Sequence, residues 1–318
     1  MTRLRPVLDA LASALVAFVF ALTFERTFVR VFDLDLRQLE WISDVVLAVA
    51  FGVATFLWLH LRLARTALTR LERTQVVIET ELSIAADIQR GLLPTPPAAR
   101  DGWRFAVQLE QAGHIGGDFY DFVDHGRSLL VLLADVSGKG IPAALVMGSA
   151  RTLFRLLARQ TDRPDELLTR LGRALFEEHR GTPYLTCFLA RLDLDARSSL
   201  WVNAGHPSAL LVAGTGHRAL GSPGLPVGLL PGAEYEAREE KLHSGDTLVL
   251  VTDGVTEAIE ADGRVEERLA WTVAQRRARG PQAICERVMR LARSGRGPAG
   301  AGAWQDDRTV VAVTLDEA

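Results

Sequence analysis

The sequence predicts an α/β protein: a layered sandwich preceded by a two-helix transmembrane hairpin and a helical linker. Two apolar runs occupy residues 7–24 and 45–61, and a proline-free segment rich in helix formers follows as far as residue 92. Beyond residue 100, short apolar segments and glycine-rich turns mix with amphipathic segments in an order that does not alternate strictly. We therefore expect three regions, residues 1–60, 61–97 and 98–318.

The overall composition is that of a globular protein with an apolar N-terminal part. With 318 residues and 48% hydrophobic content, the chain has room for about two domains and a sizeable core. The net charge of −3 gives no general basic surface, so no nucleic acid is expected as a partner. Cys187 and Cys285 have no metal-ligand spacing, and we expect two buried, reduced thiols.

Each apolar run would span roughly 25–27 Å as a helix, close to the thickness of a bilayer core. The alternatives are two buried helices of a soluble bundle, or a signal peptide for the first run. Glu25 and Arg26 stand where a signal peptide would have its small-residue cleavage site. Arginines precede the first run and follow the second, which favours a multi-pass cell-membrane protein with both termini, and the C-terminal domain, in the cytoplasm.

Residues 61–92 carry a heptad pattern in which eight of ten core positions are apolar. The a positions are Leu61, Leu68, Gln75, Leu82 and Gln89, and the d positions are Ala64, Leu71, Ile78, Ala85 and Leu92. This pattern favours a parallel coiled coil, and hence a homodimer, with polar a positions that fix the register. The alternative is a single amphipathic helix lying on the surface of the next domain. Pro94, Pro96 and Pro97 end the helix.

The C-terminal region has the apolar patterns of both strands and helices. Strands are predicted at residues 103–109, 128–134, 185–192, 199–203, 208–213, 247–252 and 309–315. Helices are predicted at residues 141–158, 164–179, 266–277 and 281–293. Because the strands do not alternate regularly with the helices, a layered sandwich is favoured over a parallel sheet.

Four aspartates stand at strand ends or beside glycines: Asp118, Asp135, Asp253 and Asp306, with Asp307 adjacent to the last. One such residue is usually a turn former, but an acid at the end of a buried strand is costly unless its charge is compensated. Strand ends at one rim of a sandwich can converge. Carboxylate oxygens suit Mg²⁺ or Mn²⁺, and two such ions about 3.5–4 Å apart can activate a water for attack on phosphorus. These residues therefore indicate a metal-dependent phosphoryl hydrolase.

Five motifs occur in order between residues 112 and 315: IGGDFYD at 115–121, ADVSGKGIPAA at 134–144, NAGHP at 203–207, TDGVTEA at 252–258 and DDRT at 306–309. In sequence and spacing they resemble the SpoIIE branch of the bacterial PPM-type phosphatases. The resemblance implies an α-β-β-α sandwich, two manganese or magnesium ions, and hydrolysis of phosphoserine or phosphothreonine in a protein.

The resemblance also implies roles for individual residues. Asp118 and Asp135 would bridge the two ions, and the backbone carbonyl of Val136 would be a further ligand. Asp253 and Asp306 would bind one ion, with Asp307 as a further candidate ligand. Eukaryotic relatives have a histidine where this chain has Ser137, so the group that protonates the leaving oxygen is unassigned, with a metal-bound water as the default.

Other polar residues of the motifs are given simpler interpretations. Lys139 is expected to be a solvated loop residue, with attraction of phosphate as the alternative. His206 is interpreted as a hairpin-turn residue, and Glu257 as a residue that supports a helix start. The helix at residues 81–94 resembles the one that precedes the catalytic domain in this family, which implies a regulatory switch; a passive spacer is the alternative.

The leading functional hypothesis is a phosphatase that acts on a phosphorylated regulatory protein. In relatives of this type the substrate is often an anti-sigma-factor antagonist. One competing hypothesis is a membrane-anchored binding module that has kept the fold without the chemistry, and a third is a small-metabolite phosphatase. The expected partners are thus a phosphoprotein, the membrane and a second copy of the chain.

Overall fold

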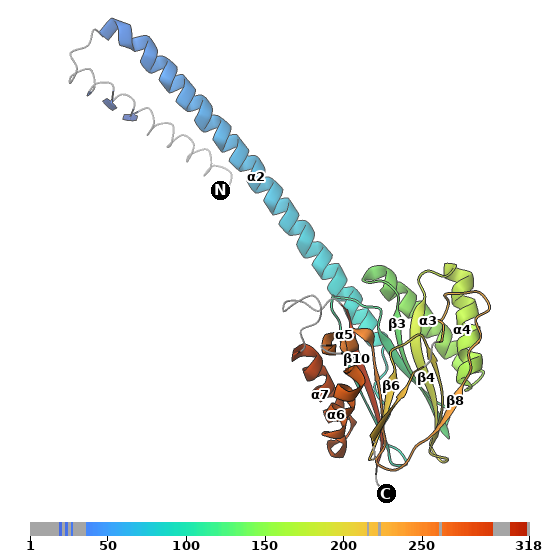
Figure 1. Ribbon diagram of the computed structural model, residues 1–318. Helices are drawn as coiled ribbons and strands as arrows, with labels where there is room; N and C mark the ends of the chain where they lie inside the picture. The colour runs from blue at the N-terminus through green and yellow to red at the C-terminus, as the bar shows by residue number, and fades with distance from the viewer. Residues whose placement is uncertain are drawn as a thin grey trace. The chain divides into compact units, whose positions relative to one another are not determined.

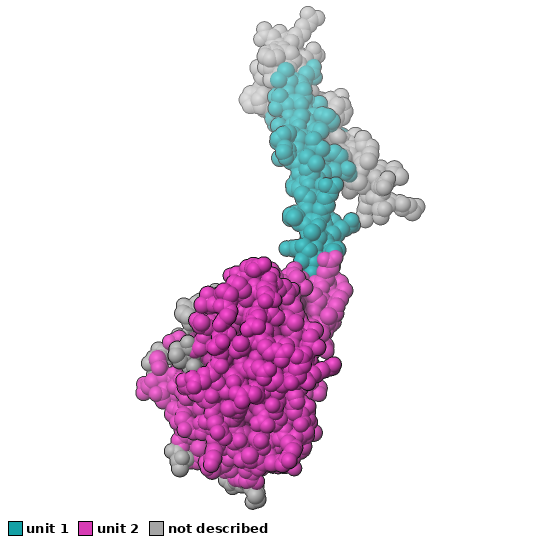
Figure 2. All heavy atoms as spheres, turned by 90° about the vertical axis from the view of Figure 1, so that its right-hand side faces the viewer, with its two compact units in different colours: residues 1–79 teal, residues 80–318 magenta. Residues whose placement is uncertain are grey.

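The computed structural model describes residues 19–20, 23–24, 27, 36–214, 216–221, 224–260, 263–294 and 306–316. The chain divides into two compact units, residues 1–79 and 80–318 (Figure 2). The first predicted membrane helix, and with it the predicted hairpin, lies largely outside the described residues.

The predicted second membrane helix and the predicted linker belong to one continuous helix, α2 (Leu36–Leu92). From Asp44 onward α2 is long and apolar enough to cross a membrane, and its most apolar stretch is not buried in the protein. This is weak support for membrane association, because the core helix α3 (Ile141–Ala158) passes the same test of length and composition.

Two five-stranded antiparallel sheets form the centre of the second unit. The first sheet has the order β1 (Trp103–Glu110), β10 (Arg308–Leu315), β9 (Thr247–Val251), β6 (Ala209–Ala213), β7 (Gly216–Leu220). The second has the order β2 (Phe119–Asp124), β3 (Ser128–Val136), β4 (Leu185–Asp193), β5 (Ser198–Ala204), β8 (Arg238–Lys241).

Helices cover the outer face of each sheet (Figure 1). The second sheet packs against α3 and α4 (Pro164–His179). The first packs against α5 (Asp253–Ile259), α6 (Val265–Ala274) and α7 (Pro281–Ser294), with the short 3-10 helix Arg277–Arg279 before α7. A third apolar cluster, which includes Phe188 and Trp201, fills the space between the sheets. The predicted α-β-β-α sandwich is confirmed.

The elements that were not predicted include β2, α5, β7 and β8. Both β7 and β8 are edge strands with mostly exposed side chains, so no buried face marks them in the sequence. The predicted helix at residues 266–277 ends at Ala274. The interpretation of His206 as a hairpin-turn residue is wrong, because β5 and β6 belong to different sheets and the NAGHP turn carries the chain from one sheet to the other.

Candidate metal centre

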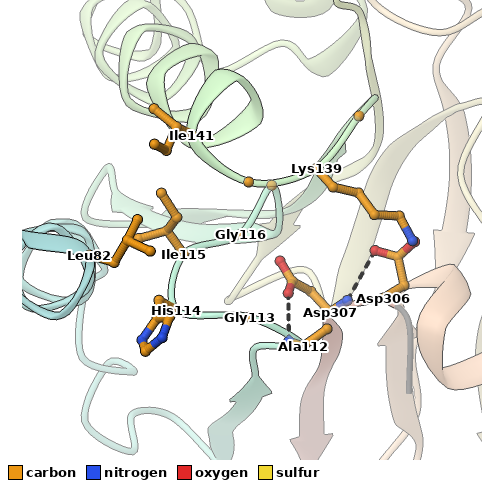
Figure 3. Close-up of a pocket in the computed structure, with 13 residues that line it drawn as sticks. Leu82, Ala112, Gly113, His114, Ile115, Gly116, Lys139, Ile141, Asp306 and Asp307 are labelled. Carbon is orange, nitrogen blue, oxygen red and sulfur yellow. Dashed lines mark hydrogen bonds and ion pairs between the residues drawn. The ribbon is translucent and has the colours of Figure 1, made fainter. Parts of the chain in front are cut away.

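A cavity of about 430 Å³ opens where three loops and the end of α2 meet (Figure 3). It is lined by Leu82 of α2, by the loop before β2, by the loop between β3 and α3, and by Asp306 and Asp307 before β10. Segments from both sheets therefore meet at this place, and of the predicted site residues Asp306 and Asp307 line the cavity.

The predicted site residues lie on both sheets. Asp118 directly precedes β2, whereas Asp135 is the penultimate residue of β3. Asp253 is the first residue of α5, which follows β9. Asp118 is buried, and its Oδ2 accepts hydrogen bonds from the hydroxyls of Thr252 at 2.8 Å and Thr309 at 2.5 Å.

Burial and the charges of neighbouring carboxyl groups raise the pKa values of several of these aspartates. Burial, followed by the charge of Asp135, raises the pKa of Asp118 well above its ordinary value. Burial, followed by the charges of Asp253, Asp306 and Asp307, raises the pKa of Asp135 to about 7. Burial and the charge of Asp306 likewise raise the pKa of Asp253. A bound divalent cation would remove this repulsion, so the cluster fits a metal centre.

Three motif glycines allow the backbone to approach these carboxylates. A Cβ on Gly116 would lie 1.6 Å from Asp307 Oδ2, and one on Gly254 would lie 2.1 Å from the Asp307 carbonyl oxygen. A Cβ on Gly117 would lie 2.8 Å from the Val136 carbonyl oxygen and 3.3 Å from Asp135 Oδ1. The Val136 carbonyl and the Asp135 carboxylate therefore lie close to the same glycine. Two ligands of one ion would need to be close together in this way.

Backbone N–H groups hold Asp307, one of the candidate ligands. Asp307 accepts backbone N–H bonds from Ala112 at 2.9 Å and Asp118 at 3.5 Å, so it fixes the loop before β2. Among the described residues, no three His, Cys, Asp or Glu side chains form a complete ligand set. The available donors are all oxygens, as hard ions such as Mg²⁺ and Mn²⁺ require, and the side chains need to turn toward an ion when it binds.

Lys139 is exposed but not merely solvated, because its Nζ lies 2.8 Å from Asp306 Oδ2. The hydrogen bond with Asp306 raises the pKa of Lys139, and the charges of Asp306, Glu257 and Asp253 act in the same direction. The interpretation of Lys139 as a solvated loop residue agrees with its exposure, but it did not include the ion pair with Asp306. Glu257 lies within α5, not at its start, and its charge helps to raise the pKa of Asp253.

Residues 125–316 match the family described as Stage II sporulation protein E (SpoIIE). The chain belongs to this family. Phosphoserine phosphatase RsbU of Bacillus subtilis is 30% identical over 198 residues, which cover 62% of this chain and 59% of RsbU. The chain thus matches less than two thirds of the length of this curated relative.

Solved structures place the SpoIIE domain in the PP2C-type phosphatase fold. The SiaA-PP2C domain of Pseudomonas aeruginosa has a TM-score of 0.63 at 22% identity, covering 76% of this chain and 99% of that one. The RsbU and RsbW domains of Rv1364c from Mycobacterium tuberculosis have a TM-score of 0.59 at 27% identity, covering 70% of this chain and 63% of that one.

Gln89 of α2 was predicted only as a polar coiled-coil position, yet it contacts the site loop of the SpoIIE domain. Its side chain is buried; Nε2 donates to the Gly116 carbonyl at 2.7 Å, and Oε1 accepts from the Gly116 N–H at 3.1 Å. Ala86, one turn earlier, is also buried, whereas the helix from residue 61 to 79 is exposed. The last turns of α2 therefore lie on the surface of the SpoIIE domain, as the alternative to the coiled coil predicts.

Replacing Gln89 with alanine is expected to lower the free energy of unfolding of the SpoIIE domain by about 1–3 kcal/mol, because the Gly116 N–H and C=O would lose their partners. Hydrogen exchange at Gly116 and in residues 80–92 should accelerate. Gln75→Ala is the control, since Gln75 is an exposed glutamine of the same helix. Equal effects of the two substitutions on exchange would contradict this contact.

His206 makes the stability of the SpoIIE domain depend on pH. Burial lowers the pKa of His206 to about 3, against an ordinary value of 6.5. The unfolded chain therefore takes up a proton at higher pH than the folded one, and stability is lost as the pH falls from 6.5 toward 3. By pH 5 the loss is about 2 kcal/mol.

Denaturant unfolding at pH 7 and pH 5 measures this effect. His206→Gln should lose less stability than the wild type between the two values, because its side chain does not titrate. His217→Gln is the control, since His217 is exposed on β7. If His206→Gln loses as much stability as the wild type between pH 7 and pH 5, His206 must already be protonated in the folded protein at pH 5.

Proposed function

We propose that the chain is a metal-dependent phosphatase that removes phosphate from phosphoserine or phosphothreonine in a regulatory protein. The observation that carries the proposal is the cluster of mutually repelling carboxyl groups from both sheets, which a pair of divalent cations would neutralise. Membership of the SpoIIE family and the phosphoserine phosphatase activity named for RsbU support it.

The proposed ligands are those that the resemblance to the PPM-type phosphatases implies. Asp118 and Asp135 would hold two Mn²⁺ or Mg²⁺ ions, with the Val136 carbonyl as a further ligand. Asp253 and Asp306 would bind a single ion. Asp307 accepts hydrogen bonds from backbone N–H groups and fixes the loop, and it would be a metal ligand in addition to that role. When bound, the ions supply an activated water and neutralise charge on the phosphoryl group.

The chain's own residues set up this chemistry. Thr252 and Thr309 hold one carboxylate oxygen of Asp118 through their hydroxyls and so orient its side chain. Asp307 holds the loop that ends in Asp118. Ser137 stands where eukaryotic relatives have a histidine, and His114, on the loop before β2, is among the residues that line the cavity. A water remains the proposed source of the proton for the leaving oxygen.

The proposed substrate is a phosphorylated anti-sigma-factor antagonist or a similar small protein. The name phosphoserine phosphatase belongs to two of the curated relatives, RsbU and RsbP. The full-length chain should release phosphate from a phosphoserine protein in Mn²⁺ and not in EDTA. Folded protein without activity toward phosphoproteins and p-nitrophenyl phosphate in saturating Mn²⁺ would favour the binding-module alternative. Turnover of phosphorylated metabolites, without turnover of phosphoproteins, would favour the small-metabolite phosphatase.

We further propose that residues 1–60 anchor the phosphatase to the cell membrane and that residues 61–79 of α2 pair with a second copy of the chain. The exposed apolar residues of α2, among them Leu61, Leu68 and Leu71, support both proposals. Sedimentation of a chain that lacks residues 1–60 tests the pairing, and a monomer would exclude it. The Gln89 contact makes α2 the proposed route by which a signal reaches the metal centre.

A further inference from the structure

Lys139 reaches across the proposed metal centre from the loop between β3 and α3. It lies between Gly138 and Gly140, whose φ angles are 102° and 70°, and no heavy atom lies within 4 Å of a Cβ placed on either glycine. The loop therefore has space to move. In Figure 3 the side chain extends to the Asp306 carboxylate, where Nζ and Oδ2 are 2.8 Å apart.

The residue type at this position is unusual for the chain. Of its 36 basic residues, Lys139 and Lys241 are the only two lysines. Arginine forms the firmer pairs, such as the two-pronged contact of Arg155 with the buried Asp121. An arginine binds a carboxylate through two parallel N–H donors, whereas an ammonium is a compact point charge on a flexible stem. A lysine at residue 139 therefore suits an ion pair that has to open.

We propose that Lys139 is an internal competitor of the divalent ion that binds Asp306. Its ammonium neutralises Asp306 in the metal-free protein and leaves when the ion enters. The inference rests on the proposed function, because it requires Asp306 to be a metal ligand. The pair is partly exposed, with 61% of the Lys139 side chain and 31% of the Asp306 side chain accessible, so a doubly charged ion displaces it readily.

The displaced ammonium has a second consequence for the site. It stays on the same short loop, beside the cavity that Asp306 and Gly140 line. There its charge favours the approach of a phosphate group. The same side chain thus protects the acidic cluster in the absence of metal and faces the substrate once metal is bound.

Amine acetylation with mass-spectrometric readout tests the displacement on the full-length chain, without substrate. On saturation with Mn²⁺, the acetylation rate of Lys139 should rise about two- to fivefold, the change in population expected for the opening of an exposed ion pair. Lys241, on the edge strand β8, is the internal control and should keep its rate. An unchanged or lower rate at Lys139 in saturating Mn²⁺ would overturn the proposal.

Mn²⁺ affinity, measured by electron paramagnetic resonance without substrate, gives a second readout. Lys139→Met should bind Mn²⁺ about two- to fivefold more tightly than the wild type, and Lys139→Arg more weakly, because a guanidinium holds Asp306 at two points. Lys241→Met removes the same charge elsewhere and should change nothing. If net charge alone mattered, Lys139→Arg would match the wild type, and that result would overturn the competition.

The two proposals fail in different ways. If Mn²⁺ binds and Asp306→Asn weakens it, but Lys139 keeps its reactivity, the competition is excluded and the proposed function stands. If Mn²⁺ binds equally well to Asp306→Asn, Asp306 is not a ligand, so the competition is excluded and the proposed function stands on the other ligands. If Mn²⁺ does not bind at all, both proposals are excluded.

Discussion

Asp135→Asn should lower Mn²⁺-dependent phosphatase turnover by more than about a thousandfold while leaving the fold in place. Asp135 is the proposed bridge between the two ions, and its carboxylate faces Gly117 together with the Val136 carbonyl. An amide of the same shape keeps the packing but removes the negative charge that the ions need. Initial rates with a phosphoserine protein and circular dichroism measure the two effects.

The same substitution should have the opposite effect on stability when no metal is present. Burial and neighbouring charges raise the pKa of Asp135 to about 7, so the ionised carboxylate destabilises the metal-free fold. This penalty grows as the pH rises from about 4 to 7 and then stays constant. At pH 8 in EDTA, Asp135→Asn should therefore be a few kcal/mol more stable than the wild type.

Mn²⁺ should reverse that order, because it stabilises the wild type by mass action and the variant much less. Asp101→Asn, an exposed aspartate outside the cluster, should match the wild type in both measurements. Wild-type turnover in Asp135→Asn would exclude the proposed mechanism, and a loss of stability in EDTA would show that the carboxylate is held by other groups.

Gly116→Ala should lower turnover by about a hundredfold or more, since a displacement of about 1 Å at a catalytic site has effects of this size. The added Cβ would lie 1.6 Å from Asp307 Oδ2. Neither partner can retreat freely: Asp307 is bound to the Ala112 N–H, and Gly116 is held by Gln89 on its other side. The methyl group therefore forces apart the loop and the aspartate that positions Asp118.

Gly148→Ala is the matched control for this substitution. The nearest heavy atom to a Cβ on Gly148 is 4.0 Å away, and alanine favours the helix α3 in which it lies. Turnover and melting temperature should be compared for both variants in saturating Mn²⁺. Full activity in Gly116→Ala would mean that Asp307 does not fix the loop during catalysis.

The sequence was sufficient to predict most elements that bury a regular apolar face, but not strand β2 or the short helix α5, although both are largely buried. The amphipathic helices α3 and α4 begin and end where predicted, and the buried strand β9 was found as well. Edge strands such as β8 could not be found in this way, because four mostly exposed polar residues carry no periodic pattern. The path of the chain between sheets at His206 also depends on tertiary packing that no local pattern encodes.

In the candidate site, too, features with a local sequence pattern were predictable and features that depend on tertiary packing were not. Strand ends and motif glycines indicated that Asp118, Asp135 and Asp253 would come together, and the repulsion among them agrees with this. The contact of Gln89 with Gly116 was not predictable, because a polar residue at a heptad a position has the same pattern whether it faces a second helix or a domain surface. The pairing of Lys139 with Asp306 joins residues that are distant in sequence.

Calorimetric titration of the full-length chain with Mn²⁺, compared with Asp253→Asn, tests the aspartate cluster most directly. The wild type should bind two ions, and Asp253→Asn should lose or strongly weaken one of them, because Asp253 is a proposed ligand of a single ion. Binding of no ion by the folded wild type, or two ions bound with equal affinity by Asp253→Asn, would contradict the proposed metal centre.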